Sequence, residues 1–278
     1  AGPITAYGGD IAVNQSLTST AAGADILLKG SGDITVAGSR TIETNNGDIT
    51  FWADSDVTGD ATTAGGAIGL LNAAAITSNG GNITLAGGAD TNNDDIPDGY
   101  AIGAYSMQAR GAINATAGLS LDNTTLDAGT GNVILRGQGT GTSQNFQIGT
   151  RLYGGSITAK DIIIEAIASK GGSSSSSWGL SLEGFSIEGS GNITLTGFGG
   201  SAGLTNSDFN QAGIEIRAAM DNSIKHSQVR ATGNGTITMN GTGGGGIFTN
   251  QSGDTQAVGI RVIANQTNPI QSQDGDIT

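Results

Sequence analysis

The sequence predicts an all-β protein, a right-handed parallel β-helix with three strands per coil and long loops on one edge. Three observations lead to this fold class. A short phrase recurs along the chain, two further apolar segments follow most of its copies, and no window shows a sustained helical stripe with capping residues. Short strands with one apolar face become stable when they stack on copies of themselves, which is how a solenoid builds its core.

The recurring phrase reads Gly, Asp or Asn, Ile or Val, usually Thr, and an apolar residue. Clear copies occupy residues 32–36, 47–51, 81–85 and 191–195, looser copies begin at Gly9, Gly131 and Gly235, and a final copy spans residues 275–278. Glycine is expected to supply backbone conformations that other residues resist, and Asp or Asn to bond nearby backbone or form ladders between coils. Ile34 and Val36 are expected to point inward and Thr35 outward, so the phrase is predicted to be a turn and the first strand of a coil.

The second and third strands of each coil are predicted between successive phrases. Second strands are expected at residues 67–71, 100–104, 146–149, 179–182, 212–216 and 258–262, and third strands at 75–77, 112–115, 156–159, 186–188, 223–224 and 269–270. A degenerate phrase at residues 161–164 supplies one further first strand. Three sides per coil favour a triangular parallel β-helix, and right-handed connections are the rule for parallel strands.

We predict a single solenoid domain over residues 1–278. Residues 1–46 are expected to form compact coils, because their glycines lie close together and strands at 26–28 and 34–36 leave little room for loops. Residues 47–278 are expected to form coils with long loops between the first and second strands. Loops at one place in a repeat project from one edge, where they either form the binding face or simply vary because surface loops tolerate change.

One of these loops has a pattern that suggests a calcium site. Oxygen-bearing groups follow an alternating spacing at Asp90, Asn92, Asp94, Ile96 (through its carbonyl) and Asp98. The segment resembles the calcium loops of bacterial thrombospondin type-3 repeats, and this resemblance implies a bound Ca²⁺. Two positions depart from that pattern: Asp95 replaces the usual glycine, and Ala101 replaces the closing glutamate.

The composition excludes several classes of function. A net charge of −13 disfavours binding to nucleic acid and to anionic membranes. Aromatic residues make up 4% of the chain, which argues against a groove that recognises sugars by stacking. The absence of cysteine excludes disulfides and thiolate chemistry, and no apolar run is long enough for a membrane helix.

The sequence offers little support for catalysis, and we expect the protein not to be an enzyme. Its one histidine, His226, has no identifiable acid and nucleophile partners. Carboxylates at Asp161, Glu183, Glu188 and Glu215 fall on predicted strands of different coils without forming a repeated cluster. Threonine recurs once per phrase, as at Thr50 and Thr84, which predicts a row one residue wide instead of a flat ice-binding array.

With its phrases, loops and acidic composition together, the chain resembles the repeat regions of filamentous haemagglutinin-like bacterial adhesins. The phrases beginning at Gly32, Gly47, Gly81, Gly131 and Gly191 carry this resemblance across nearly the whole chain. The secretion domain of that family has Asn-Pro motifs near its N-terminus, whereas here Asn268-Pro269 lies near the end. The resemblance implies secretion, a cell-surface or matrix location and a passenger repeat segment without its export module.

We therefore expect a secreted bacterial solenoid that serves as a structural or adhesive element of an extracellular fibre or surface layer. Two alternatives remain, a β-helix polysaccharide lyase or hydrolase and an ice- or surface-binding solenoid. The chain begins and ends within repeats, so we expect coils to continue in a longer parent chain or in copies stacked end to end. Surface glycans or proteins are the other expected partners.

Overall fold

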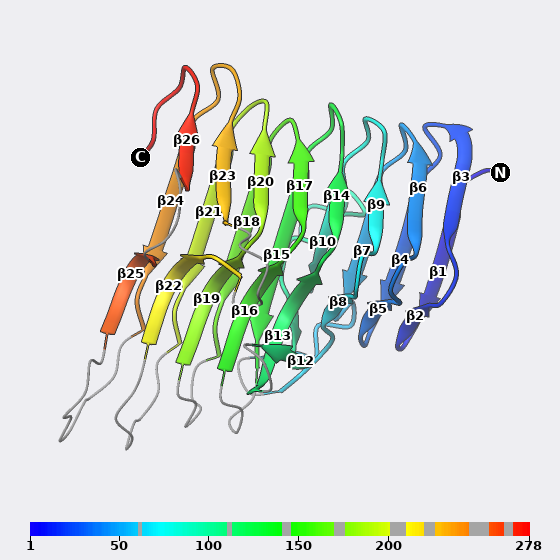
Figure 1. Ribbon diagram of the computed structural model, residues 1–278. Coiled ribbons are helices and arrows are strands. Elements are labelled where there is room, and N and C mark those ends of the chain that lie inside the picture. Colours follow the sequence, from blue (N-terminus) through cyan, green and yellow to red (C-terminus); the bar gives the residue numbers. More distant parts are fainter. Residues whose placement is uncertain are drawn as a thin grey trace.

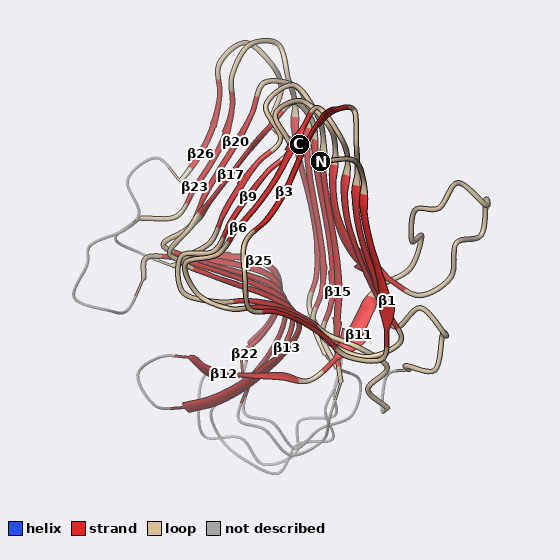
Figure 2. Ribbon diagram, turned by 90° about the vertical axis from the view of Figure 1, so that its right-hand side faces the viewer, coloured by secondary structure: helices blue, strands red, loops and turns tan. Residues whose placement is uncertain are grey.

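The chain is a three-sided parallel β-helix, as the sequence predicts. The structure is a computed structural model and describes residues 1–60, 63–109, 113–140, 146–169, 176–200, 210–219, 226–244, 256–263 and 269–278. Figure 1 shows the coils following one another along the stack in chain order, with the two termini at opposite ends. Figure 2 looks along the stack, where the three sheets form the sides of a triangle.

Three sheets, here named A, B and C, each receive one strand per coil, and neighbouring strands along each path are parallel. Sheet A runs through β1 (Ile4–Gly8), β4 (Ile26–Gly30), β7 (Ile49–Ala53), β10 (Ile83–Gly87), β15 (Val133–Gly139), β18 (Ile162–Ile167), β21 (Ile193–Phe198) and β24 (Ile237–Thr242). Sheet B runs through β2 (Ile11–Val13), β5 (Ile34–Val36), β8 (Ile68–Leu70), β13 (Ile113–Asp122), β16 (Phe146–Tyr153), β19 (Ser176–Glu183), β22 (Asn210–Arg217) and β25 (Gln256–Val262). Sheet C runs through β3 (Leu17–Ala22), β6 (Thr41–Asn45), β9 (Ala75–Thr77), β14 (Thr125–Asp127), β17 (Ser156–Ala159), β20 (Ser186–Gly189), β23 (Gln228–Ala231) and β26 (Ile270–Ser272).

The core is a narrow column of branched aliphatic side chains inside the triangle. Equivalent positions pair in register, so Ile49 lies beside Ile83, and Ile83 beside Val133. These side chains are fully buried. Within a strand the burial alternates, as in β4, because successive side chains point to opposite faces. Burial of each such side chain contributes about 1.5–3 kcal/mol, which the short strands could not obtain alone.

The Asp or Asn of the phrase ties each coil to the next. The side-chain oxygen of Asp48 accepts a hydrogen bond from the backbone N–H of Asn82 at 2.7 Å, and the Asn82 oxygen accepts one from Asn132 at 3.0 Å. The ladder continues through Asp161, Asn192 and Thr236, and it begins one coil earlier at Asp25. The predicted ladder between coils is therefore confirmed, and each bond runs from one coil to the backbone of the following one.

The expected reason for the phrase glycines is wrong for most of them. Their φ angles lie outside the left-handed region. Glycine is needed there because the coils approach closely: a Cβ on Gly81 would overlap the carbonyl oxygen of Gly47, and one on Gly131 would overlap that of Gly81. Left-handed backbone occurs beside them, at Asn46 and Gly80 just before two copies of the phrase, and also at the corner between sheets B and C, at Gly154 and Gly184.

A second set of small residues brings sheets A and B into backbone contact, and we call it the glycine seam. Its members are Gly137, Ala166, Gly197 and Gly241 in sheet A, and Gly149, Gly179, Gly213 and Gly259 in sheet B. A Cβ on Gly197 would overlap the carbonyl oxygen of Gly213. Beyond the seam, the strands of sheet B continue into a separate apolar cluster, in which the Phe146 and Trp178 rings stack with centroids 5.1 Å apart.

The first-strand assignment of the phrase is wrong near the N-terminus. The copies at Gly9 and Gly32 lead into β2 and β5, which belong to sheet B, whereas the later copies lead into sheet A. Their acidic residues form a shorter ladder of their own, in which Asp10 accepts from the backbone of Asp33 and Asp33 from that of Ala67. The same phrase therefore builds two corners of the triangle.

The coil that begins with β10 also differs from its prediction. Its expected second strand, residues 100–104, contains β11 (Ala101–Gly103), which pairs with β15 in sheet A. Of its expected third strand, residues 112–115, the described residues 113–115 form the start of β13 in sheet B, and β14 is the true third strand. The cause is an inserted strand, β12 (Tyr105–Ala109), which pairs with β13 in the antiparallel sense.

The insertions between sheets A and B follow the predicted place in the repeat, although other connections are long as well. Residues 54–60 and 63–67 lie between β7 of sheet A and β8 of sheet B, whereas residues 88–100 lie between β10 and β11, which both pair in sheet A. Long connections also separate β22 from β23 and β25 from β26, at the corner of sheets B and C. The predicted third strand at residues 223–224 lies outside the described residues, and β23 holds its place in sheet C. The final phrase copy continues sheet A, since Ile277 pairs with Ile237.

Replacing a seam glycine should destabilise the stack strongly. We expect Gly197→Ala to lower the free energy of unfolding by about 1–3 kcal/mol or more, because the new methyl group would overlap the backbone of sheet B. The measurement is urea denaturation followed by circular dichroism. Gly9→Ala is the matched control, since nothing lies within 4 Å of its Cβ position. If the two substitutions lower the free energy of unfolding equally, close backbone contact at the seam is not what makes glycine necessary there.

Removing one rung of the ladder should have a smaller effect. We expect Asn82→Ala to cost about 1–2 kcal/mol of unfolding free energy, because the partly buried N–H of Asn132 loses its acceptor. Asn82→Asp keeps an acceptor oxygen and should leave most of the stability in place. Thermal melts of the three proteins compare them directly, and an alanine variant as stable as the parent would refute the role of the ladder.

Candidate functional site

The predicted calcium loop is a compact turn closed by its own side chains. Asp90 accepts hydrogen bonds from the backbone N–H groups of Asp94 and Asp95, at 3.2 and 2.9 Å. Asp98 accepts from the backbone N–H of Thr91 at 2.8 Å and from its hydroxyl group at 2.5 Å. These two bonds hold the pKa of Asp98 below its ordinary value, the hydroxyl having the larger effect. They stabilise the loop above the ordinary pKa and are lost as the pH falls through the lowered one.

The structure accommodates one departure of this loop from the calcium pattern. Asp95, in the place of the usual glycine, has a left-handed φ of 63°. Asn92 and Asp94 bond within the loop, Asn92 accepting from the backbone of Asp94, and Asp94 from that of Ile96. Within the described residues, no group of three or more acidic or histidine side chains is placed to hold a metal ion. Calcium binding by this loop stays a prediction.

Calorimetric titration tests that prediction. We expect Ca²⁺ to bind at neutral pH, because the loop offers carboxylate, amide and carbonyl oxygens at alternating positions. Asp94→Asn should weaken binding about tenfold or more by removing a central charge, whereas Asp127→Asn, in β14, should not change it. The absence of binding heat at millimolar Ca²⁺ would refute the site.

The long connection after β7 is anchored by a buried acid. The Asp54 carboxylate is fully buried and accepts hydrogen bonds from the backbone of Thr58 and Gly59, at 3.0 and 2.9 Å. Burial raises the pKa of Asp54, and these two bonds oppose that effect only in part. The same connection is held to β11, since the N–H groups of Gly65 and Gly66 donate to the carbonyl of Ile102.

A row of charged side chains lies on the outer face of sheet B, and we call it the charged row. It contains Asp122, Arg151, Glu183, Glu215, Arg217 and Arg261, contributed by five successive strands from β13 to β25. The register sets Glu183 beside Arg217, and Glu215 beside Arg261. The alternate residues of the same strands, such as Leu182 and Ile214, enter the core.

The charged row is mostly closed to solvent. Arg151 lies 3.6 Å from Glu183, and each of these side chains is 1% exposed. Glu215, fully buried, lies 3.5 Å from both Arg217 and Arg261. Exposure rises toward the C-terminal end, to 29% at Arg261. Because buried ions are costly unless they are paired, loss of one partner from these pairs should destabilise the fold.

Glu183 and Glu215 occupy different coils, as the sequence predicts, but these two coils are adjacent. They lie on neighbouring strands, with Glu215 directly beside Ser181. The alternation of polar and apolar residues in β19 and β22 places both carboxylates on the outer face. The two glutamates come close because of the length of the coil between them. Coils differ in length, and no local sequence pattern predicts this length. Glu188 lies instead on sheet C, where it pairs with Arg230 at 3.4 Å.

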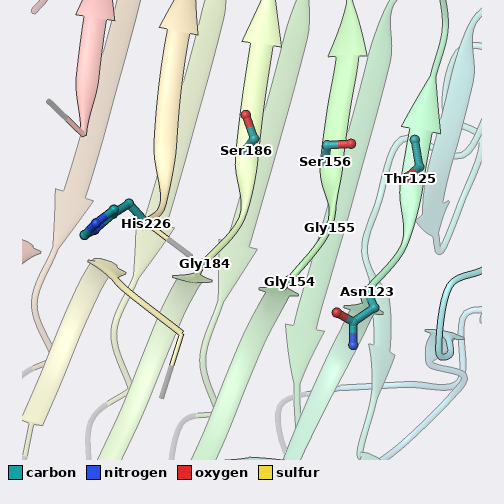
Figure 3. Close-up of a pocket in the computed structure, with 8 residues that line it drawn as sticks. All are labelled: Asn123, Thr125, Gly154, Gly155, Ser156, Gly184, Ser186 and His226. Carbon is teal, nitrogen blue, oxygen red and sulfur yellow. The ribbon is translucent and has the colours of Figure 1, made fainter. Parts of the chain in front are cut away.

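A polar groove of about 380 Å³ follows the corner between sheets B and C. Its lining residues, shown in Figure 3, are Asn123, Thr125, Gly154, Gly155, Ser156, Gly184, Ser186 and His226. The hydroxyl-bearing residues come from β14, β17 and β20, and the glycines from the turns before β17 and β20. His226 lies at one end, and its Nδ1 is buried without a hydrogen-bond partner in the described structure. The lone histidine therefore borders a groove, which its sequence context did not indicate.

The threonine row of sheet A is interrupted. Thr84 pairs with Ile134, Ile134 with Ile163, and Ile163 with Thr194. Thr35, which the sequence places in the same row, lies on sheet B. The outer face of sheet A therefore alternates between hydroxyl and apolar stretches along the stack.

Comparison with known proteins gives no match to a family model, to a curated protein or to a solved structure. The part of the sequence resemblance that the structure supports is the β-solenoid fold, seen in three stacked parallel sheets, and no family is identified. In the ranges that the structure describes, no helix is long and apolar enough to cross a membrane.

Neutralising one acid of the charged row should test its role. We expect Glu215→Gln to lower the free energy of unfolding by about 2–4 kcal/mol, because Arg217 and Arg261 lose a buried counter-ion. Glu188→Gln is the matched control, since it breaks an exposed pair worth at most about 1 kcal/mol. Urea denaturation gives the free energy of unfolding of both variants. If Glu188→Gln lowers it as much as Glu215→Gln does, the buried pairs of Glu215 contribute no more than an exposed pair.

Proposed function

We propose that this chain is a structural and adhesive element of an extracellular bacterial fibre or surface layer. The observation that supports the proposal is the continuous stacking of its coils. Each coil joins the next through three parallel sheets and through the ladder of Asp and Asn side chains. Such a stack is rigid along its axis, while insertions at the corners can vary without disturbing the core.

The surface chemistry supports the same role. The net charge of −13 keeps the protein soluble and repels anionic surfaces. The described corner loops are rich in Asp, Asn, Gly and Thr, which suits contact with hydrated surfaces outside the cell. The resemblance in repeat style to filamentous haemagglutinin-like adhesins agrees with secretion and a cell-surface location.

Further coils are the partners we propose for the ends of the stack. In the described structure, β1, β2 and β3 lie at one end of the three sheets, and β25 and β26 at the other. The outward backbone groups of such strands are suited to pair with another parallel strand. The added coils belong either to a longer chain or to a neighbouring copy.

An edge-blocking variant tests the stacking of copies. The N–H of Ile4 faces β4, so by alternation the N–H of Thr5 faces outward. We expect the parent protein to form particles longer than the roughly 40 Å of eight coils spaced about 4.8 Å apart, with light scattering and electron micrographs as the measurements. Thr5→Pro should stop this growth and Thr5→Val should not. A discrete 27.5 kDa particle at every concentration would refute assembly by stacking.

A further inference from the structure

The groove at the corner of sheets B and C carries a row of available hydroxyl groups. Thr125 pairs with Ser156, and Ser156 with Ser186, so their side chains stand one per coil along the axis. Parallel strands repeat every 4.7–4.9 Å, approximately, and the hydroxyl groups share this spacing. Within the described chain, none of the three hydroxyl groups hydrogen-bonds to another residue. They are therefore available to a ligand that lies across the coils.

The floor of the groove is backbone. Gly154 and Gly184 turn the corner in left-handed conformations, with φ angles of 67° and 59°. Asn123 takes the same conformation one coil earlier, and its amide lies against Gly154. Glycine at position 154 makes room for this amide, so the floor of the groove consists of the Asn123 amide and of peptide groups.

The lining selects against charged ligands. Its side chains are hydroxyl groups, one amide and the imidazole of His226, and it contains no carboxylate or guanidinium. The charged row lies on the neighbouring sheet, where its acids and bases pair with one another. The overall charge of −13 adds a field that repels polyanions. Neutral, multiply hydroxylated molecules fit these conditions.

We propose that this groove binds a neutral polysaccharide laid along the solenoid axis. Sugar hydroxyl groups both donate and accept hydrogen bonds, and so do those of Thr125, Ser156 and Ser186. A polymer that crosses several coils makes several weak contacts at once, and their combined effect exceeds each one. Asn123 and the imidazole of His226 add further polar groups to the lining. This inference rests on the proposed adhesive function and names the class of surface that is bound.

Recognition in this groove works without the stacking of sugars on large aromatic rings, since the lining contains no Phe, Tyr or Trp. The sequence-based argument from low aromatic content excludes stacking grooves and does not apply to one built from hydroxyl groups and backbone. Binding to a single short sugar should be weak, because each neutral hydrogen bond makes only a small net contribution. Affinity should therefore increase with the length of the polymer.

Affinity electrophoresis through gels containing dextran, laminarin, galactomannan or, as the polyanionic comparison, alginate tests the proposal. We expect at least one neutral polymer to retard the protein. Ser156→Leu combined with Ser186→Leu should weaken this retardation about fivefold or more by filling the groove. Thr158→Leu is the matched control, because it lies on the same strand and face as Ser156 but outside the lining. Circular dichroism checks that all variants keep the strand signal of the parent.

Three results would overturn the groove: no retardation by any neutral polymer, retardation by alginate alone, or equal weakening by the Thr158 control. These outcomes are separate from those of the stacking experiment, which depends on the strand edges. Long particles without polysaccharide binding would refute binding in the groove and leave the proposed structural role in place. Polysaccharide binding by a discrete particle would support binding in the groove and refute assembly by stacking.

Discussion

The close approach of sheets A and B is the constraint on which the rest of the architecture depends. At the glycine seam, backbone packs on backbone, so that even a Cβ on glycines such as Gly197 and Gly241 would overlap the facing sheet. The seam therefore closes the triangle on one side and separates the main core from the smaller cluster around Phe146 and Trp178. It also lets strands such as β16 and β19 run past the corner into that cluster, while the charged row lies on the other side of the seam, where the alternate residues enter the main core.

The ladder of Asp and Asn side chains acts along the other direction, from coil to coil. Each rung satisfies a backbone N–H at a corner, where the chain turns and sheet bonds cannot reach. Asp and Asn are interchangeable as acceptors in this role, and both occur. The seam and the ladder have separate roles. The seam glycines set the distance between sheets A and B, and the Asp and Asn side chains set how each coil stacks on the next. Connections outside them are free to vary in length.

Local patterns predicted most strands and the three-sided coil, because a turn residue followed by period-two alternation is visible in the sequence itself. They could not assign strands to sheets. The phrase at Gly32 looks the same as the one at Gly47, yet the two enter different sheets. They also could not distinguish an inserted strand from a coil strand, since β12 and β13 have similar apolar content. The groove and the charged row were beyond sequence reasoning for the same reason. Both need the register of residues that coils of unequal length bring together.

The charged row and the groove follow from the same strands of sheet B and have opposite relations to solvent. The row closes the outer face of these strands, where ions must be paired because they are buried. Immediately after those strands, Gly154 and Gly184 turn the chain toward sheet C and leave the backbone open. A rigid, internally neutralised face thus lies next to an open, neutral corner whose hydroxyl groups repeat with the coils. The seam and the ladder keep that spacing constant, and a constant spacing is what recognition of a repeating polymer requires.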